Sequence, residues 1–114
     1  MIDPEVHDVV FKALADHRRR AMLDLLKRRP RTTGELCARF DELDRCTVMQ
    51  HLAVLEKADL VIAKRRGRER WNYLNAIPIK EIHDRWIGEY ASGAARLLAR
   101  LKADLKAERR RDPG

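Results

Sequence analysis

Apolar residues recur at intervals of three and four along most of the chain, a spacing that predicts helices. Pro4 can occupy the first position of the first helix, and the apolar stripe of this helix extends to Leu14. The stripe consists of Val6, Val9, Val10, Ala13 and Leu14. This pattern predicts an amphipathic helix that packs one face on the rest of the chain.

A second helix is expected from His17 to Arg28. Asp16 has the chemistry of its N-cap, and Pro30 should end it because proline disfavours helical geometry in the preceding residue. Its inward positions are Met22, Leu25 and Leu26. The arginines at positions 18–20 lie in its first turn, where the positive end of the helix dipole disfavours them. Two interpretations stay open: their stems pack on neighbouring side chains, or their guanidinium groups bind phosphate.

Two shorter helical segments follow, joined by a turn at residues 41–43. Thr32 and Thr33 can begin the first segment. In that segment Leu36 and Phe40 share one face. Asp44 can cap the second segment, whose apolar positions are Val48, Leu52 and Leu55. Together these segments predict a helix-turn-helix.

The second helix of this motif leaves mostly polar side chains off its buried stripe near its N-terminus. These are Arg45, Cys46, Thr47, Met49, Gln50 and His51. A helix that directs such groups outward from its first turns can read base edges in the major groove of DNA. We expect Arg45, Thr47 and Gln50 to contact base edges and the other three residues to lie close by.

Residues 60–63 are rich in β-branched side chains and predict a short strand, and a second strand is expected over residues 71–74. Trp71 and Tyr73 share one face of the second strand, which we expect to pack on the helices. Gly67 lies at the tip of the tight connection between the strands. The pattern predicts a β-hairpin, called the wing below.

The wing carries a cluster of arginines at and beside its tip. They are Arg65, Arg66, Arg68 and Arg70. A run of charge is often only a solvated surface. Because this run directly follows a helix-turn-helix, we expect its side chains to point outward and to contact DNA phosphates or the minor groove.

The last apolar stripe runs through residues 75–108 and predicts one long helix with Pro78 near its first turn. Its apolar positions are Ile79, Ile82, Trp86, Tyr90, Ala94, Leu97, Leu101 and Leu105. The stripe is longer than the small body can cover, so we expect a second copy of the chain to cover it. The predicted dimer interface comprises Val6, Val9, Val10, Ile79, Ile82, Trp86, Tyr90 and Leu97. Gly88 and Gly93 weaken the middle of this helix and can mark a bend, and residues 109–114 should fray.

The chain has 114 residues, 45% of them hydrophobic, which suits one domain over residues 1–114. Its formal net charge of +7 favours a polyanionic partner, with nucleic acid ahead of an anionic membrane surface. No apolar run approaches membrane-spanning length and the first residues lack the pattern of a secretory leader, so we expect a cytoplasmic protein without a membrane partner. We expect no enzymatic activity, because Ser92 is the only serine and no phosphate-binding loop or strained nucleophile turn accompanies it.

The two cysteines, Cys37 and Cys46, are too few for a disulfide framework and fit a reduced compartment. They lie on different predicted helices, and the sequence leaves open whether a disulfide joins them. Cys46 lies near a helix N-terminus and beside Arg45. An alternative interpretation is therefore that Cys46 is a thiol that senses oxidants within the helix predicted to read DNA.

Several of these segments together resemble the ArsR family of winged-helix repressors. They are the residues FKALAD at 11–16, GEL at 34–36, the run from 48 to 55 with HL inside it, RGR at 66–68 and YL at 73–74. The resemblance covers nearly the whole chain. Residues 75–88 are especially similar to the branch often encoded beside START-like lipid-binding or chaperone-activator-like proteins. The resemblance implies an autoregulatory homodimer that pairs through its first and last helices and docks two reading helices in successive major grooves.

The chain departs from the family where metal-sensing members bind their ions. Those members carry a Cys-x-Cys pair after Glu-Leu, whereas here Arg39 stands two residues after Cys37. The alternative site on the last helix uses paired Asp and His ligands, and this chain offers only His83 beside Asp84. We therefore expect no metal and no cofactor. The turn at 41–43 also lacks the usual glycine and is one residue longer.

The combined prediction is a mainly α domain with a small β-hairpin, a dimeric winged helix-turn-helix that represses transcription by occluding a promoter. Its partners are double-stranded DNA and a second copy of the chain. Two alternatives stay open. One is a small basic interaction or adaptor protein that uses its C-terminal stripe for a different partner, and the other is a nonspecific DNA-binding protein.

Overall fold

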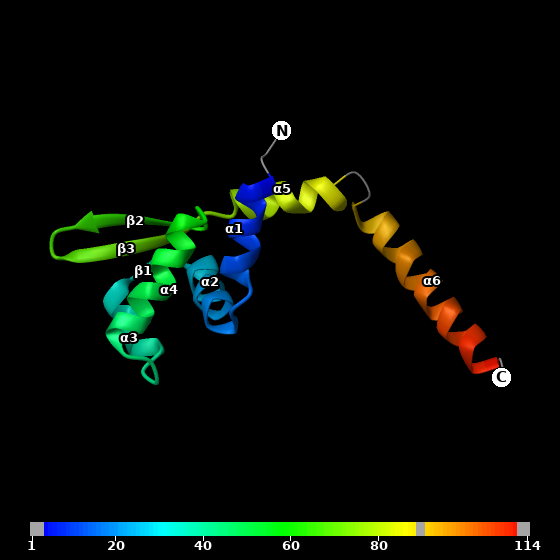
Figure 1. Cartoon of the computed structure of the whole chain (residues 1–114), viewed down its shortest axis with the longest axis horizontal. Helices are drawn as coiled ribbons and strands as arrows, with labels where there is room; N and C mark the ends of the chain where they lie inside the picture. The colour runs from blue at the N-terminus through cyan, green and yellow to red at the C-terminus, as the bar shows by residue number, and fades with distance from the viewer. Residues whose placement is uncertain (1–3, 89–90, 112–114) are drawn as a thin grey trace. The chain divides into compact units, whose positions relative to one another are not determined.

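The computed structural model describes residues 4–88 and 91–111. The chain forms two compact units, residues 1–82 and residues 83–114. In chain order the elements are α1 (Pro4–Leu14), α2 (His17–Arg28), β1 (Arg31–Thr32), α3 (Thr33–Arg39), α4 (Arg45–Lys57), β2 (Val61–Arg66), β3 (Glu69–Leu74), α5 (Ile77–Trp86) and α6 (Ala91–Arg111) (Figure 1). This is the predicted winged helix-turn-helix, with α3 and α4 as its two helices and β2 and β3 as the wing.

The core of the first unit lies where α1, α2, α3 and α4 meet the base of the sheet. Its side chains are Val10, Ala13, Met22, Leu23, Leu26, Leu36, Phe40, Val48, Leu52, Leu55, Ala58, Leu60 and Val61. The inward positions predicted for α3 and α4 are confirmed. In α2 Met22 and Leu26 are buried as predicted, and Leu25 turns inward but is only half-buried against the core. Leu23, which the sequence did not single out, is also buried.

The inward face of α1 differs from the predicted stripe. Its buried residues are His7, Val10 and Ala13, spaced three apart, so Val6 and Val9 stay exposed. Both ring nitrogens of His7 are buried without a hydrogen-bond partner in the described part of the chain. The apolar positions of α1 therefore divide between the core and the surface.

The predicted helix starts are confirmed by side-chain caps. Asp16 accepts hydrogen bonds from the backbone N–H groups of Arg18 at 2.8 Å and Arg19 at 3.3 Å. The Thr32 hydroxyl accepts one from the N–H of Glu35 at 3.1 Å. Each cap satisfies donors that have no partner within the helix. The short sequence signals at these positions therefore fix where the helices begin.

Two arginines in the first turn of α2 have a role that neither interpretation from the sequence included. The Arg19 side chain donates to the carbonyls of Ala13 at 2.7 Å and Lys12 at 3.0 Å, and Arg20 donates to the Leu14 carbonyl at 2.6 Å. These carbonyls form the negative C-terminal end of α1. The two arginines thus cap the preceding helix.

The sheet has three strands in the order β1-β3-β2, all antiparallel. The sequence did not predict β1, a two-residue strand that pairs Arg31 with Asn72 and Thr32 with Trp71. A strand this short carries no alternation of its own, so only its pairing with β3 defines it. At the wing tip Gly67 has φ 61°, as the predicted tight turn requires.

The prediction that Trp71 and Tyr73 pack on the helices is wrong. Asn72 is the fully buried residue of β3 and Leu74 packs against the core, so the other face of the strand meets the helices. The Asn72 side-chain amide donates to the Arg31 carbonyl and to the Thr33 hydroxyl, both at 3.2 Å. These two bonds tie the wing to β1 and to the start of α3.

The prediction of one long C-terminal helix over residues 75–108 is also wrong. Helix α5 ends at Trp86, and α6 begins at Ala91. The N–H groups of Ile87 and Gly88 both donate to the His83 carbonyl, at 2.8 Å and 3.2 Å, which closes the end of α5. A Cβ at Gly88 would lie 2.9 Å from the Asp84 carbonyl oxygen, so this turn requires glycine. The sequence had marked Gly88 as a possible bend.

Helix α6 belongs to the second unit, and the side chains described along it are exposed. Its exposed leucines are Leu97, Leu98, Leu101 and Leu105. Tyr90, predicted for the dimer interface, lies outside the described residues, as does the side chain of Ala94. Residues 109–111, predicted to fray, are the last turn of α6. No helix in the described part of the chain is both long enough and apolar enough to cross a bilayer.

Candidate nucleic-acid interface

Helix α4 presents one exposed face opposite its buried stripe. Val48, Leu52 and Leu55 are fully buried. Because a helix turns by about 100° per residue, the side opposite them carries Cys46, Gln50, Ala53 and Lys57, all exposed. Sequence reasoning had not selected Ala53 and Lys57, although their spacing from Cys46 and Gln50 would have shown them. This face of α4 has the character needed to enter a major groove. We call it the reading face, and α4 the reading helix.

The start of α4 is held by the cap at Asp44. Its carboxylate accepts a hydrogen bond from the Thr47 N–H at 2.7 Å. That bond, together with the Thr47 hydroxyl, lowers the pKa of Asp44. Thr47 is half-buried and engaged with its own cap, so its side chain is less available for a base edge than the sequence suggested.

His51 lies on the side of α4 that faces α2. Its Nδ1 is 3.3 Å from Nη1 of Arg19, and its Nε2 is buried without a partner among the described atoms. Burial lowers the pKa of His51, the Arg19 and Arg18 charges lower it further, and Asp16 opposes them. The structure therefore places the His51 imidazole between α4 and α2 and away from the exposed face.

Arg45 and Met49 lie on the side of α4 toward the wing. With residues of the wing and of the start of α3 they border a cleft of about 320 Å³. Its other lining residues are Thr32, Thr33, Gly34, Arg65, Arg68, Glu69 and Arg70. Arg45, Arg65 and Arg68 thus border one hollow, together with Glu69 and with Arg70, which is paired with Glu56. Such a hollow suits the phosphates of a DNA backbone.

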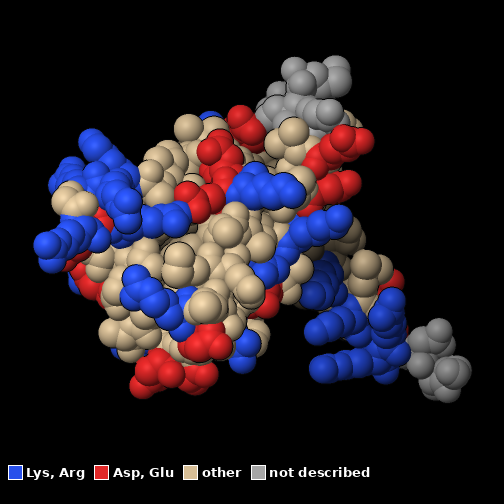
Figure 2. All heavy atoms as spheres, turned by 60° about the vertical axis from the view of Figure 1, so that its left-hand side comes forward, with Lys and Arg blue, Asp and Glu red and all other residues tan. Residues whose placement is uncertain are grey.

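The wing extends away from the helices of the first unit (Figure 1). Arg65, Arg66 and Arg68 are exposed near its tip, as predicted. Figure 2 shows Lys and Arg side chains gathered over this part of the molecule, at the left of the view. Ladder pairs between β2 and β3 place Arg65 opposite Arg70 and Arg66 opposite Glu69. The wing therefore brings positive charge beside Arg45 and Met49 of α4.

Arg70 does not point outward with the other wing arginines, so that part of the prediction is wrong. Its guanidinium donates to the carboxylate of Glu56 in α4, and each side chain is about one-third exposed. Its Nε is buried without a partner in the described structure. Arg70 thus joins the wing to the reading helix instead of being free for DNA.

Both cysteines are free thiols. Cys46 is exposed on the reading face, and Cys37 is half-buried in α3. In residues 4–88 and 91–111, no three His, Cys, Asp or Glu side chains come together as they would around a metal ion. The His83 ring lies 3.4 Å from the Asp84 carboxylate, a pair within one turn of α5.

Comparison with known proteins agrees with this geometry. A family model described as a helix-turn-helix domain matches residues 14–62, from the end of α1 to the start of β2. The chain is 38% identical over 86 residues to YuzN, an uncharacterized HTH-type transcriptional regulator of Bacillus subtilis (strain 168), with 70% of this chain and 94% of YuzN covered. It is 32% identical over 72 residues to the transcriptional repressor SdpR of the same organism, with 63% of this chain and 79% of SdpR covered.

Among solved structures, the crystal structure of an ArsR family transcriptional regulator matches with a TM-score of 0.69 and 32% sequence identity. That match covers 78% of this chain and 90% of the other. The chain belongs to the ArsR family. This ArsR family member is a DNA-binding transcriptional regulator with a winged helix-turn-helix fold.

Proposed function

We propose that this ArsR family regulator is a homodimeric repressor that binds a pseudo-palindromic operator and occludes a promoter, including its own. The observation that carries the proposal is the exposed face of α4 together with a cleft bordered by Arg45, Arg65 and Arg68. Similarity to SdpR, whose name states repression, supports the direction of control. Such a regulator acts on chromosomal DNA, so we place it in the cytoplasm.

In this proposal base readout is centred on Arg45, Cys46, Met49 and Gln50, which are exposed at the start of α4. Thr47 and His51 lie at the edge of that surface. Arg65, Arg66 and Arg68 neutralise phosphates on either side of the groove. Phosphate contacts fix register and orientation, whereas contacts to base edges supply preference among sequences.

The proposed dimer explains apolar side chains that the folded chain leaves exposed. Val6 is 52% exposed, Trp86 57% and Leu97 67%, and Ile79 is also exposed. Ile82 and Val10 have a different role, because Ile82 packs partly against the core and Val10 is buried in it. They support their exposed neighbours and offer little surface to a second copy. A two-fold dimer places two reading helices about one helical turn of DNA apart.

The test measures binding of the purified chain to DNA from upstream of its own coding sequence, across a series of salt concentrations. A scrambled duplex of the same length and composition is the control. A repressor of this kind should bind the upstream duplex at least about a thousandfold more tightly at physiological salt. Equal affinity for both duplexes with a steep salt slope would indicate a nonspecific binder. No salt-dependent binding to either would favour an adaptor protein.

A further inference from the structure

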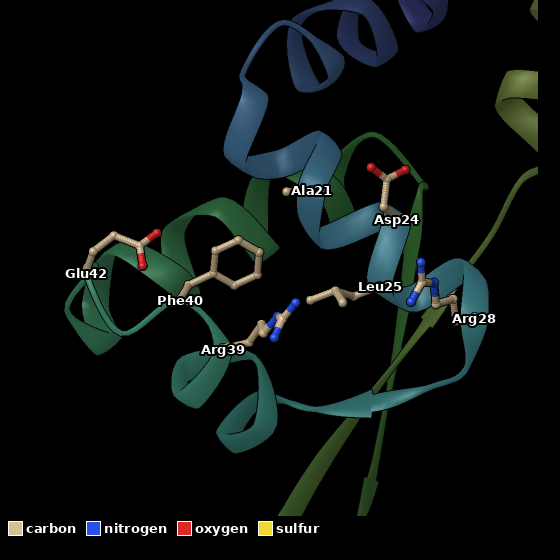
Figure 3. Close-up of a pocket in the computed structure, with 7 residues that line it drawn as sticks. All are labelled: Ala21, Asp24, Leu25, Arg28, Arg39, Phe40 and Glu42. Atoms are coloured by element: carbon tan, nitrogen blue, oxygen red, sulfur yellow. The ribbon is translucent and has the colours of Figure 1, made fainter.

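A second hollow lies in the first unit, between α2 and the end of α3, and none of its lining residues belongs to the cleft beside the wing. It is open to solvent and has a volume of about 350 Å³, within the size range of small-molecule sites. Helix α2 contributes Ala21, Asp24, Leu25 and Arg28, α3 and its C-cap contribute Arg39 and Phe40, and the turn before α4 contributes Glu42 (Figure 3). We call it the α2–α3 hollow.

The floor of the α2–α3 hollow is apolar. Phe40 is 8% exposed and belongs to the core, and Ala21 and Leu25 are half-buried against it. In Figure 3 the side chains of Phe40, Leu25 and Arg39 point into a common space. Leu25, which is half-buried against the core, is therefore part of this floor. An apolar group placed there would lose its contact with water on one side.

Four charged side chains border the floor, two of each sign. Asp24, Arg28, Arg39 and Glu42 take part in no hydrogen bond or ion pair among the described residues. Charged side chains near the hollow, by contrast, do have partners. Nη2 of Arg29, the C-cap of α2, lies 2.9 Å from Oε2 of Glu35, and Arg20 donates to the Leu14 carbonyl at the end of α1. The rim of the hollow thus presents charges that the fold itself does not use.

We propose that the α2–α3 hollow binds a zwitterionic amphiphile, namely a free α-amino acid with an apolar side chain. Its side chain would lie over Phe40 and Leu25, its carboxylate would pair with Arg28 and Arg39, and its ammonium group with Asp24 or Glu42. A simple anion would leave the two carboxylates beside it unmatched, and a simple cation would leave the two arginines unmatched. Only a ligand with both charges complements this rim.

The hollow touches the turn that leads into the reading helix. The Phe40 N–H donates to the Leu36 carbonyl at 2.9 Å, and the Phe40 carbonyl accepts from the Leu43 N–H at 3.0 Å. Glu42 lies inside this turn, two residues before the cap Asp44. A ligand held between α2 and Glu42 therefore shifts the turn toward one conformation and changes the affinity of α4 for DNA. This regulatory half of the proposal, the effect of the ligand on DNA affinity, rests on the proposed function, whereas ligand binding does not.

The first experiment titrates the intact chain, without DNA, with L-leucine and with L-phenylalanine by isothermal calorimetry. Three analogues isolate the parts of leucine: 4-methylpentanoate lacks the ammonium group, 3-methylbutylamine lacks the carboxylate and glycine lacks the side chain. We expect saturable binding of one amino acid per chain, and at least about fivefold weaker binding of each analogue, since each loses one exposed pairing or the apolar contact. No saturable binding of either amino acid, or equal binding of 4-methylpentanoate, would overturn the proposal.

The second experiment places the ligand by substitution. Arg39→Gln and Glu42→Gln should each weaken leucine binding at least about fivefold. Lys27→Gln and Asp41→Asn are the matched controls, because they remove the same charges from exposed positions beside the hollow that do not line it. Circular dichroism checks that all four variants are folded. If the controls weaken binding as much as the variants, the ligand is elsewhere and the proposal is wrong.

The third experiment separates this inference from the proposed function. Leucine is added to the complex of the chain with its upstream duplex, and we expect an affinity change of at least about threefold that Arg39→Gln abolishes. If the chain alone binds leucine but does not prefer its upstream DNA, the proposed function is wrong, whereas leucine binding in the α2–α3 hollow is still supported. If it prefers that DNA but leucine does not alter the affinity, the regulatory half is overturned.

Discussion

Two arginines in the wing, two positions apart, have different environments. Arg68 is exposed near the tip, whereas Arg70 donates to Glu56 in α4. Both pairing groups keep about one-third of their surface exposed, so solvent screens the interaction and its net free energy is modest. The pair nevertheless links the wing to the reading helix, and its loss should affect folding more than DNA contact.

A double-mutant cycle tests this pairing. Glu56→Ala, Arg70→Ala and the double variant are unfolded in urea, and the coupling free energy should be about 0.5–1 kcal/mol. The same cycle with Arg68→Ala in place of Arg70→Ala is the control and should be additive, because Arg68 has no contact with Glu56. Additive effects in both cycles would show that the Glu56–Arg70 contact does not stabilise the fold.

The environment of His51 predicts that the stability of the fold depends on pH. Its pKa in the folded chain is lowered from 6.5, first by burial and then by the Arg19 and Arg18 charges, against the attraction of Asp16. The unfolded chain therefore binds a proton at this residue more readily than the folded chain. The free energy of unfolding should decrease as pH falls through about 6.5. We expect His51→Gln to lose less stability than wild type between pH 7 and pH 5.

The measurement is urea unfolding at several pH values, with His17→Gln as a comparison for removing an exposed imidazole. Because Gln cannot gain a proton, the variant isolates the contribution of residue 51 from that of the other titrating groups. Parallel pH profiles for wild type and His51→Gln would contradict this account of the α4–α2 contact.

At the scale of elements, α4 and the wing should divide readout from positioning. The exposed face of α4 carries Gln50 and Cys46, which can reach base edges, while the wing offers guanidinium groups. The cleft between them is bordered by arginines from both elements. We therefore expect a substitution in α4 and a substitution in the wing to change DNA binding in different ways.

Arg68→Ala should weaken binding to all DNA sequences alike. It should also flatten the dependence of affinity on salt by about one unit of logarithmic slope for one lost phosphate contact, or about two if both copies contribute. Gln50→Ala should instead relax preference at particular positions of the operator. Both variants are measured against operator and scrambled DNA across salt. The division is wrong if Arg68→Ala changes sequence preference and Gln50→Ala does not.

At the scale of the whole molecule, the proposed dimer rests on exposed apolar side chains. The exposed positions assigned to that dimer lie in α1, α5 and α6, and because α5 ends at Trp86 the last two helices contribute separate stretches. Leu97, Leu101 and Leu105 follow one side of α6 at intervals of four. A soluble monomer would leave this stripe in water.

Leu97→Glu tests whether the α6 stripe forms the dimer. A charge buried without a partner between two copies costs several kcal/mol, whereas on an exposed face it costs little. We expect the variant to be monomeric in analytical ultracentrifugation and to lose tight operator binding, because one reading helix cannot span two half-sites. Circular dichroism accompanies the measurement, since some dimers unfold on separation.

Ala99→Glu is the matched control, because residue 99 is exposed and lies about 200° around the helix from residue 97. This variant should remain dimeric and bind its operator. If folded Leu97→Glu also sediments as a dimer and binds with wild-type affinity, the α6 stripe has no role in dimerisation.

The sequence alone determined the elements that local chemistry specifies. Asp16 and Asp44 mark the starts of α2 and α4, the spacing of Val48, Leu52 and Leu55 gives the buried side of α4, and Gly67 marks the wing turn. Each of these signals acts within about one turn of helix or one tight turn of strand, so neighbouring residues in the sequence are enough to read it. The reading helix and the exposed wing arginines were predicted on that basis.

Only the tertiary structure decided features that depend on residues far apart in the chain. Strand β1 exists through its pairing with Asn72, and the inward face of β3 is set by what lies against it. Arg70 meets Glu56, and His51 meets Arg19 across 32 positions. The periodicity of one segment cannot show which of its two faces finds a partner, or which of several arginines finds a carboxylate. Those choices depend on packing between elements, where contacts join residues that the sequence keeps apart.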